Sequence, residues 1–368
     1  MTTRLRLCIS ILLVLAVSAA LPLYAQNFLA KGDDTASSFG QFWILIDPPF
    51  QAMFAGCPAY NAATHILQSP LLYDSATTVI GRSAPIKEGS PQDNAGVPVG
   101  SAGTVVKDGG MIVPSGFAPI APGSNEVHTE LRHLNMATWP PVPPANQARV
   151  RAGVCYNSPA CSAPPPANRI SAGEVVSNHS PAGSPPDFPA RSYFDVYAQI
   201  DIPACGGFPA ATVFNKNPLL VETASISSFP PSGVVYEHDT SSAVGVKFVG
   251  NGPKWKKNER LGCVILAGHG IVPRFPRRAT LEEAPAGVQQ VAFQKEQEKV
   301  GQKVESEARM RPPQNEEIER EGAKFQEHMK AHFERYGNRH KDCGPKEKDD
   351  GNDQGDEGKG KGKGKGRD

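Results

Sequence analysis

The stretch RSYFDVYAQID (residues 191–201) decides the fold class, because its apolar residues recur at every second position. One face of the extended chain carries Phe194, Val196, Ala198 and Ile200. A period of two, with aromatic and β-branched residues, is typical of a half-buried strand. The following Ile-Pro stops the strand, because proline cannot donate to a ladder. Asp201 is therefore predicted to cap a turn and to have no catalytic role.

A second stretch, FGQFWILIDPP (residues 39–49), repeats this pattern and its stop at proline. Each copy is followed by a cysteine, Cys57 or Cys205, and then by a segment that contains Pro-Leu-Leu. Three matches in the same order predict a duplicated unit. Coincidence in a proline-rich β protein is the alternative.

Further short strands are expected between these landmarks, separated by turns rich in Gly, Pro, Asn and Asp. They are Thr104–Lys107, Glu126–Leu134, Ala148–Tyr156, Gly173–Ser177, Gly233–Glu237, Ala243–Val249 and Leu261–Ala267. No helical periodicity of useful length occurs before residue 280. The pattern predicts a mainly β protein with two tandem sandwich-like units, residues 26–165 and 166–275.

The first 25 residues have the layout of a secretory signal peptide. Arg4 and Arg6 precede a short apolar run, and Leu23-Tyr24-Ala25 offers a cleavage site. We expect cleavage near Ala25 and export to the periplasm, the cell surface or the extracellular space. An uncleaved N-terminal anchor is the alternative. No later segment is apolar long enough to act as a transmembrane anchor.

The formal net charge of +1 argues against nucleic-acid binding as a specific function, since that needs a basic face. After the predicted cleavage, six of the 7 cysteines remain, and disulfides are the default in an oxidising compartment. Six cysteines allow 15 connectivities. We favour Cys155 with Cys161, because a short loop joins them, and Cys205 with Cys263 as a weaker hypothesis. The chain has no CxxC pair, which argues against a zinc ribbon or a thioredoxin-like site.

A charged helical region is expected over residues 280–337, interrupted by Pro312 and Pro313. Its second helix is capped by Asn315 and closed by Gly337. The helix carries a thin apolar stripe of Ile318, Phe325, Met329, Phe333 and Tyr336. The two helices could pair as a coiled-coil hairpin, dock on the β region or meet a partner. The Gly- and Lys-rich residues 338–368 are predicted to be disordered.

The segment NEVHTELRHLN (residues 125–135) contains the best candidate metal ligands. On a strand, Glu126, His128 and Glu130 project from one face and could bind a divalent metal such as zinc or manganese. His238, in YEHD, could join them as a further ligand. The favoured interpretation is a solvated sheet face with alternating charges. The alternative is a secreted metal-dependent hydrolase.

The loop GNGPKWKKNER (residues 250–260) is the most plausible ligand-contact surface. Its candidate ligand-binding residues are Lys254, Trp255, Lys256, Lys257 and Arg260. Cations beside an exposed tryptophan suit an anionic polymer, a glycan or the cell envelope. The favoured alternative is that the tryptophan folds back onto the core.

Three other histidines are candidate functional residues. His269 lies between two glycines, where a bulge or turn is the favoured interpretation. His328 and His332 stand four residues apart, a spacing that permits metal binding, but solvated helix polarity is favoured.

The segments DFPARSYFDVYAQID and FPPSGVVYEHD resemble uncharacterised exported bacterial β-rich proteins over about residues 187–240. That resemblance implies export and β structure and brings no activity with it. No GxSxG elbow, HExxH, Walker loop or GxGxxG motif occurs in the chain. We therefore expect a non-catalytic binding or structural module without a cofactor. The sequence does not indicate an oligomeric state.

Overall fold

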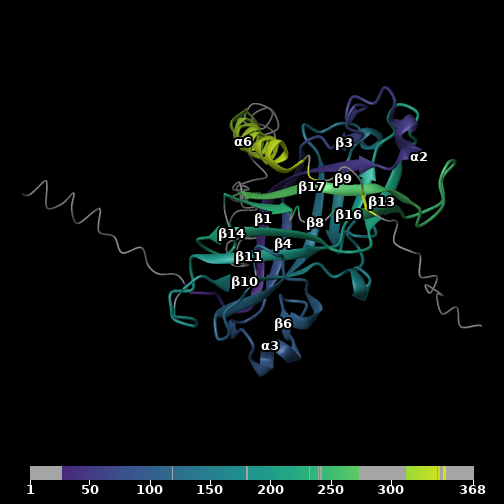
Figure 1. Cartoon of the computed structure of the whole chain (residues 1–368). Coiled ribbons are helices and arrows are strands. Elements are labelled where there is room, and N and C mark those ends of the chain that lie inside the picture. The colour runs from purple at the N-terminus through teal and green to yellow at the C-terminus, as the bar shows by residue number, and fades with distance from the viewer. Residues whose placement is uncertain are drawn as a thin grey trace, which may run out of the picture.

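The computed structural model describes residues 27–117, 119–179, 181–231, 233–238, 240, 243–272, 312–337, 339 and 343–344. Within them the chain is mainly β, as the alternating pattern predicts, and one large antiparallel sheet dominates (Figure 1). None of the helices in this described part is long and apolar enough to cross a membrane. The expected signal peptide, residues 1–25, lies outside the described residues.

The main sheet contains β1 (Gly32–Ile46), β2 (Tyr60–Asn61), β3 (Ile66–Gln68), β4 (Leu72–Arg82), β5 (Ile86–Lys87), β8 (Asn125–Thr138), β9 (Arg149–Gly153), β10 (Ala172–Ser177), β11 (Ala190–Val196), β12 (Gln199–Ile202), β13 (Ala211–Asn215), β14 (Leu219–Ile226), β15 (Val234–His238), β16 (Val244–Phe248) and β17 (Arg260–Val272). A separate two-stranded sheet consists of β6 (Val97–Val99) and β7 (Thr104–Val106). The α-helices are α2 (Pro48–Gln51), α3 (Pro91–Ala95) and α6 (Pro312–Tyr336). The 3₁₀ turns are η1 (Ala52–Phe54), η2 (Asp108–Gly110), η3 (Pro144–Asn146) and η4 (Ala167–Arg169).

Four long strands, β8, β4, β1 and β17, pair in that order and form a shared wall. Along its other edge, β8 pairs first with β10 and then with β9. In the same way β17 pairs first with β16 and then with β15. The hydrogen-bonded path therefore closes twice. One ring continues through β15, β14, β11 and β10, and the other through β16, β13, β12 and β9.

The expected division at residue 165 does not separate two sheets. β1, close to the N-terminus, pairs with β17 from Ser37 to Ile46, and β9 pairs with β12 across the expected boundary. One apolar cluster fills the interior of both rings. The strands interleave because ring closure satisfies backbone groups that two separate sheets would leave at their edges.

The stretch at residues 191–201 forms two strands, β11 and β12, with a break at Tyr197 and Ala198. Asn215 bridges the break, because its side chain accepts from the Ala198 amide at 2.7 Å and donates to the Val196 carbonyl at 2.7 Å. The predicted inward face is confirmed: the interior cluster includes Phe194, Val196, Ala198 and Ile200.

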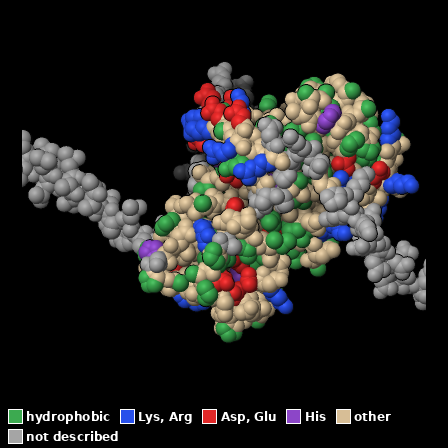
Figure 2. Space-filling model, viewed as in Figure 1, with side chains coloured by type: hydrophobic (Ala, Val, Ile, Leu, Met, Phe, Trp, Pro, Cys, Tyr) green, Lys and Arg blue, Asp and Glu red, His purple; other side chains and the backbone are tan. Residues whose placement is uncertain are grey.

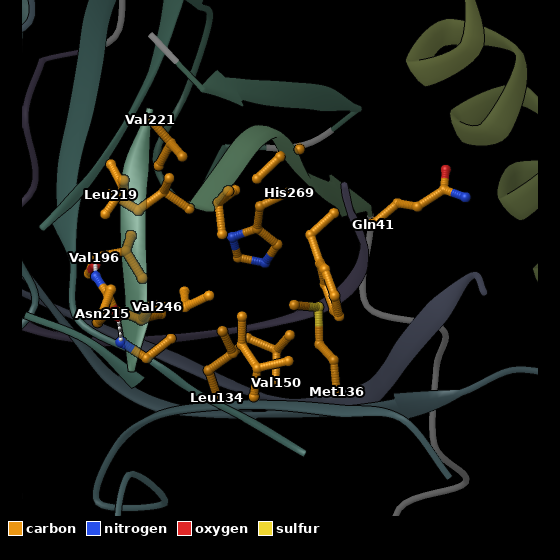
Figure 3. Close-up of a pocket in the computed structure, with 18 residues that line it drawn as sticks. Gln41, Leu134, Met136, Val150, Val196, Asn215, Leu219, Val221, Val246 and His269 are labelled. Atoms are coloured by element: carbon orange, nitrogen blue, oxygen red, sulfur yellow. Dashed lines mark hydrogen bonds between the residues drawn. The ribbon is translucent and has the colours of Figure 1, made fainter. Parts of the chain in front are cut away.

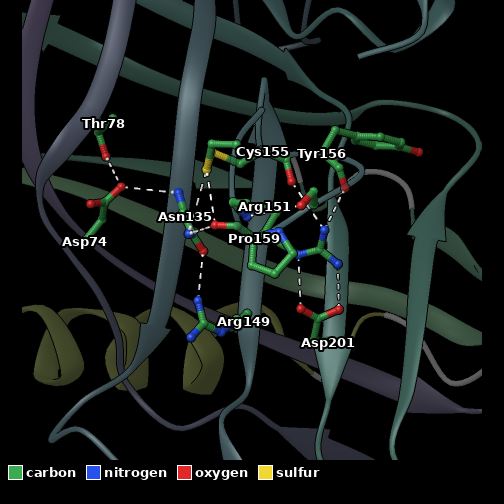
Figure 4. Close-up of a disulfide and its surroundings, with 12 residues drawn as sticks. Asp74, Thr78, Asn135, Arg149, Arg151, Cys155, Tyr156, Pro159 and Asp201 are labelled. Atoms are coloured by element: carbon green, nitrogen blue, oxygen red, sulfur yellow. Dashed lines mark hydrogen bonds and ion pairs between the residues drawn. A yellow bond between two sulfur atoms is a disulfide. The ribbon is translucent and has the colours of Figure 1, made fainter. Parts of the chain in front are cut away.

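Asp201 has a structural role in the second ring (Figure 4). Both of its carboxylate oxygens accept from the buried Arg151 guanidinium, at 2.7 and 3.0 Å. Arg151 also donates to the carbonyls of Cys155 and Tyr156. The carboxylate thereby orients an arginine that holds the 155–161 loop.

The expected disulfide between Cys155 and Cys161 is present (Figure 4). The Cys205–Cys263 hypothesis is wrong, because Cys205 joins Cys57 and Cys263 joins Cys343. The loops after β1 and β12 meet at one end of the second ring, where the Gly207 amide donates to the Met53 carbonyl. The two cysteines that follow the two Ile-Asp-Pro-type stops are therefore partners of each other.

Helix α6 docks on the outer face of β1 and β17, one of the three arrangements its stripe allows. Its buried residues Ile318, Phe325 and Met329 join an outer apolar cluster. Gly268 permits this approach, because a Cβ there would lie 2.1 Å from the Met329 sulfur. The helix begins at Pro312, three residues before the predicted Asn315 cap. Its solvent face carries mixed acidic and basic side chains (Figure 2).

Two C-terminal expectations meet the structure only in part. The helix expected before Pro312 lies outside the described residues, as does most of the segment 338–368. Cys343 belongs to that segment, which was expected to be disordered, yet it is bonded to Cys263 of β17. The disulfide holds this point of the chain against the sheet.

Candidate functional site

The chain between β4 and β8, residues 83–124, is named here the excursion because it leaves the main sheet and returns to it. It contains β5, α3, β6, β7 and η2 (Figure 1). β5 pairs with the start of β8. The Ser83 hydroxyl accepts from the His128 amide at 3.0 Å, so the entry to the excursion is anchored on the same strand. The excursion therefore lies over the outer face of β8.

Alternation along β8 determines which side chains the excursion covers. Val127 and Leu131 point into the interior cluster, so Glu126 and His128 point outward. On β10 the interior residue is Val175, so Glu174 also points outward. Glu174 and His128 are direct cross-strand partners.

Four side chains meet between the excursion and the sheet and form the carboxylate–histidine cluster, which consists of Asp93, Glu126, His128 and Glu174. The Nε2 atom of His128 lies 3.0 Å from Asp93 Oδ1, 3.6 Å from Glu174 Oε1 and 3.8 Å from Glu126 Oε1. The side chains are at most 1% exposed. Asp93 comes from α3, whose Ser90 N-cap accepts from the Asp93 amide.

The tautomer of His128 can be deduced from its other ring nitrogen. Nδ1 lies 3.2 Å from the carbonyl oxygen of Val106, and a carbonyl can only accept. Nδ1 therefore carries a proton, and Nε2 faces the carboxylates. Metal-binding histidines usually show this arrangement, in which one nitrogen donates to a carbonyl and the other binds the ion.

Several buried polar atoms of the cluster make no hydrogen bond of good geometry: His128 Nε2, Asp93 Oδ1 and both carboxylate oxygens of Glu126 and of Glu174. Tyr193 lies close enough to Glu174, and Glu88 to Glu126, to affect the pKa values of these two carboxyl groups. Leaving buried charged groups unpartnered costs far more free energy than leaving exposed ones. A bound cation or added protons would remove that cost.

The electrostatics point the same way. Burial, reinforced by neighbouring carboxylates, raises the pKa of Glu126 to about 10 and the pKa of Glu174 to about 9. Burial also raises the pKa of Glu88, at the half-buried edge of the cluster. In the described part of the chain, no lysine or arginine forms an ion pair with these carboxylates.

The arrangement offers metal-ligand geometry. Donor atoms of Asp93, Glu126 and His128 all lie within 4.8 Å of one another, and so do donor atoms of Glu88, Glu126 and Glu174. The set combines carboxylate oxygens with one imidazole nitrogen, which suits borderline divalent ions. It can hold an ion, and its Asp93, Glu126, His128 and Glu174 side chains are all buried.

The sequence-predicted metal residues are only partly brought together. Glu126 and His128 are in the cluster, whereas Glu130 faces Thr104 and Arg132, and His238 lies on β15 outside the cluster. Asp93 and Glu174 were missed. Their positions in the sequence carry no spacing signal, because they reach His128 through the fold of the excursion and the β8–β10 pairing.

The 250–260 loop does not present its tryptophan to solvent. Trp255 is buried, and its ring stacks on Phe248 at 4.4 Å and on Phe208 at 5.4 Å. Arg260 is paired with Asp47 at 2.9 Å. Of the five candidate ligand-binding residues, only Lys254, Lys256 and Lys257 are exposed.

His328 and His332 of α6 converge on one carboxylate. Glu237 Oε1 lies 2.7 Å from His328 Nε2 and 3.3 Å from His332 Nδ1. Burial lowers the pKa of His332, while the neighbouring Glu237 raises it. These contacts join the helix to β15, and the open groove beside them is also lined by Glu222 and Arg191.

An apolar cavity of about 60 Å³ lies inside the molecule, and strands of both rings contribute residues to its lining (Figure 3). It contains a second polar group without a hydrogen-bond partner, the Nε2 atom of His269. His269 projects into it from β17, between outward-facing glycines, and is part of a regular strand. The favoured expectation of a bulge or turn at His269 is therefore wrong. Burial lowers the pKa of His269 to about 4, so the imidazole is neutral.

No protein-family model and no curated protein sequence matches this chain. Among solved structures, DynF from the dynemicin biosynthesis pathway of Micromonospora chersina is similar, with a TM-score of 0.38 and 13% sequence identity. The match covers 71% of this chain and 90% of that chain. A likeness of this size does not establish the fold or the activity of this chain.

Proposed function

We propose that this chain is an exported, non-catalytic binding module in which the carboxylate–histidine cluster holds one divalent cation. The observation that carries the proposal is the buried His128 Nε2 atom, which faces carboxylate oxygens of Asp93, Glu126 and Glu174 at 3.0, 3.8 and 3.6 Å. The ion joins α3 of the excursion to β8 and β10 and thereby locks the excursion onto the sheet. Its role is structural.

The ligand set favours manganese or zinc. Calcium and magnesium prefer oxygen ligands alone, whereas an imidazole beside carboxylates suits manganese, iron or zinc. A 2+ ion also offsets the negative charge of Glu126 and Glu174, whose pKa values stay high only without it. Because the ligands bind in their deprotonated forms, affinity should rise with pH.

A metal-dependent hydrolase with the same ligands is the rival function. A catalytic metal needs an open coordination position and a path for substrate. The complete burial of Glu126, His128 and Glu174 favours the structural role. Glu88, whose donor atom lies within 4.8 Å of donor atoms of Glu126 and Glu174, is half-buried.

Export is supported by the signal-peptide layout of residues 1–25 and by three disulfides, which persist in oxidising compartments. The exposed Lys254, Lys256 and Lys257 are the proposed contact with anionic polymers or glycans of the cell envelope. Nothing in this contact requires catalysis.

Metal analysis of the purified full chain tests the proposal. We expect about one equivalent of manganese or zinc. His128→Gln should weaken metal affinity by roughly 10–100-fold or more. His328→Gln, a histidine change on exposed α6, should leave the metal content unchanged and is the matched control.

Protein that contains no manganese or zinc, and that binds neither ion on titration, would contradict the metal centre. Calcium bound equally by the parent and by His128→Gln would show that the imidazole is not a ligand. Metal-dependent hydrolysis of ester, amide or phosphate test substrates, lost in His128→Gln while the fold is retained, would favour the hydrolase.

A further inference from the structure

The cavity between the two rings has a wall that is almost entirely aliphatic. Val196 and Val221 line it from β11 and β14, and Val150 and Val246 line it from β9 and β16 (Figure 3). It lies where the inner faces of both rings meet, so neither ring fills it alone. Protein interiors are normally packed without voids of this size.

Polar groups in this wall are few. Asn215 is already used in bridging the β11–β12 break. Gln41 donates to the Ser69 carbonyl at 3.1 Å, and its side chain lies away from the cavity in Figure 3. The remaining polar side chain is that of His269, whose Nε2 atom has no hydrogen-bond partner.

Water is a poor occupant of such a space. A buried water typically makes about three hydrogen bonds, and dry cavities are those lined by apolar groups. Here a water would find one ring, His269, and aliphatic carbon on its other sides. An occupant with one polar end and an apolar body would therefore fill the void and give the His269 Nε2 atom a hydrogen-bond partner.

We propose that the cavity is a binding site for a small neutral molecule with an apolar body and one hydroxyl group, which hydrogen-bonds to the His269 imidazole. The volume of about 60 Å³ limits the occupant. An apolar cavity of roughly 150 Å³ accepts benzene with its six heavy atoms, so this one accepts a molecule of about two or three heavy atoms. Short-chain alcohols belong to this class.

Titration of the histidine-labelled full chain with ethanol, followed by the NMR resonances of the His269 ring nitrogens, tests the site. We expect a saturable shift of the His269 resonances, with those of exposed His328 unchanged. Val246→Phe keeps the imidazole but fills the cavity, and it should weaken binding by at least about tenfold. His269→Phe should also abolish saturable binding.

The His328 resonances of each variant report whether the fold is intact. If either variant unfolds, xenon competing with ethanol in the parent protein gives the second measurement. Competition supports the cavity as the site. A shift linear in ethanol concentration, ethanol binding undiminished in folded Val246→Phe, or a His269 ring in slow contact with a trapped water would overturn the proposal.

Discussion

One row of polar side chains crosses the outer face of the first ring, and its two ends behave differently. In register from β8 to β15, the row runs through His128, Glu174, Tyr193, Glu222 and Glu237. The first end is sealed under the excursion, and the second end borders an open groove beside α6. Both ends combine carboxylates with histidines, so the cover over the residues, more than their type, distinguishes a candidate metal centre from a solvated contact.

Removing the cation should produce the largest effect. We expect chelation with EDTA to lower the free energy of unfolding by about 4 kcal/mol, the stabilisation given by a ligand at roughly 1,000 times its Kd. Chemical denaturation with and without chelator measures this. Equal stability in both conditions would mean that bound protons, without a cation, neutralise the carboxylates at the sealed end of the row.

The next largest effect should be the pH dependence of stability that comes from half-buried His269. Its pKa is about 4 in the folded chain and about 6.5 when unfolded, so the unfolded chain binds the proton first as pH falls. The neutral ring's contribution is complete above pH 6.5 and is lost as pH falls towards 4, by about 3 kcal/mol. Urea unfolding at pH 7.5 and 4.5 should show this loss in the parent and a smaller one in His269→Phe. Identical losses would contradict it.

A conservative change at the sealed end should have an intermediate effect. Asp93→Asn keeps the shape of the side chain but removes a negative ligand 3.0 Å from His128. We expect metal affinity to fall about 10–100-fold, close to 1.4–2.7 kcal/mol. Isothermal titration with manganese or zinc measures the change, and unaltered affinity would remove α3 from the ligand set.

A change at the exposed end of the row should have little effect on the free energy of unfolding. Glu237→Gln breaks contacts to His328 and His332, but an ion pair open to water contributes only about 0–1 kcal/mol. Thermal unfolding should therefore shift little. A loss as large as that caused by chelation would show that the cover does not decide the strength of these contacts.

The inward face of residues 191–201 was predictable, because burial of Phe194 and Ile200 leaves a period of two in the sequence. The same period predicted that Glu126 and His128 share a face. It could not show whether that face is exposed to solvent or buried, because that depends on whether the excursion covers it. Asp93 reaches His128 only through the fold of α3, and no local pattern records such a contact.

Ring closure also could not be predicted from the period-two pattern of the sequence. Alternation identifies strands, but it does not say that β8 and β17 each serve two neighbours along one edge. The disulfide pairing failed for the same reason. Cys263 lies on a strand whose outer face is covered by α6, and its partner Cys343 is 80 residues away in sequence.

The bond between Cys263 and Cys343 has a consequence for how α6 leaves the sheet. A protease that cuts the chain anywhere between Val272 and Pro312 releases no fragment, because the helix stays covalently joined to β17. An undocked helix held in this way returns from an effective local concentration of about millimolar, whatever the dilution outside. Cleavage and reduction together are therefore needed to set this part of the molecule free, since either one alone leaves a covalent link.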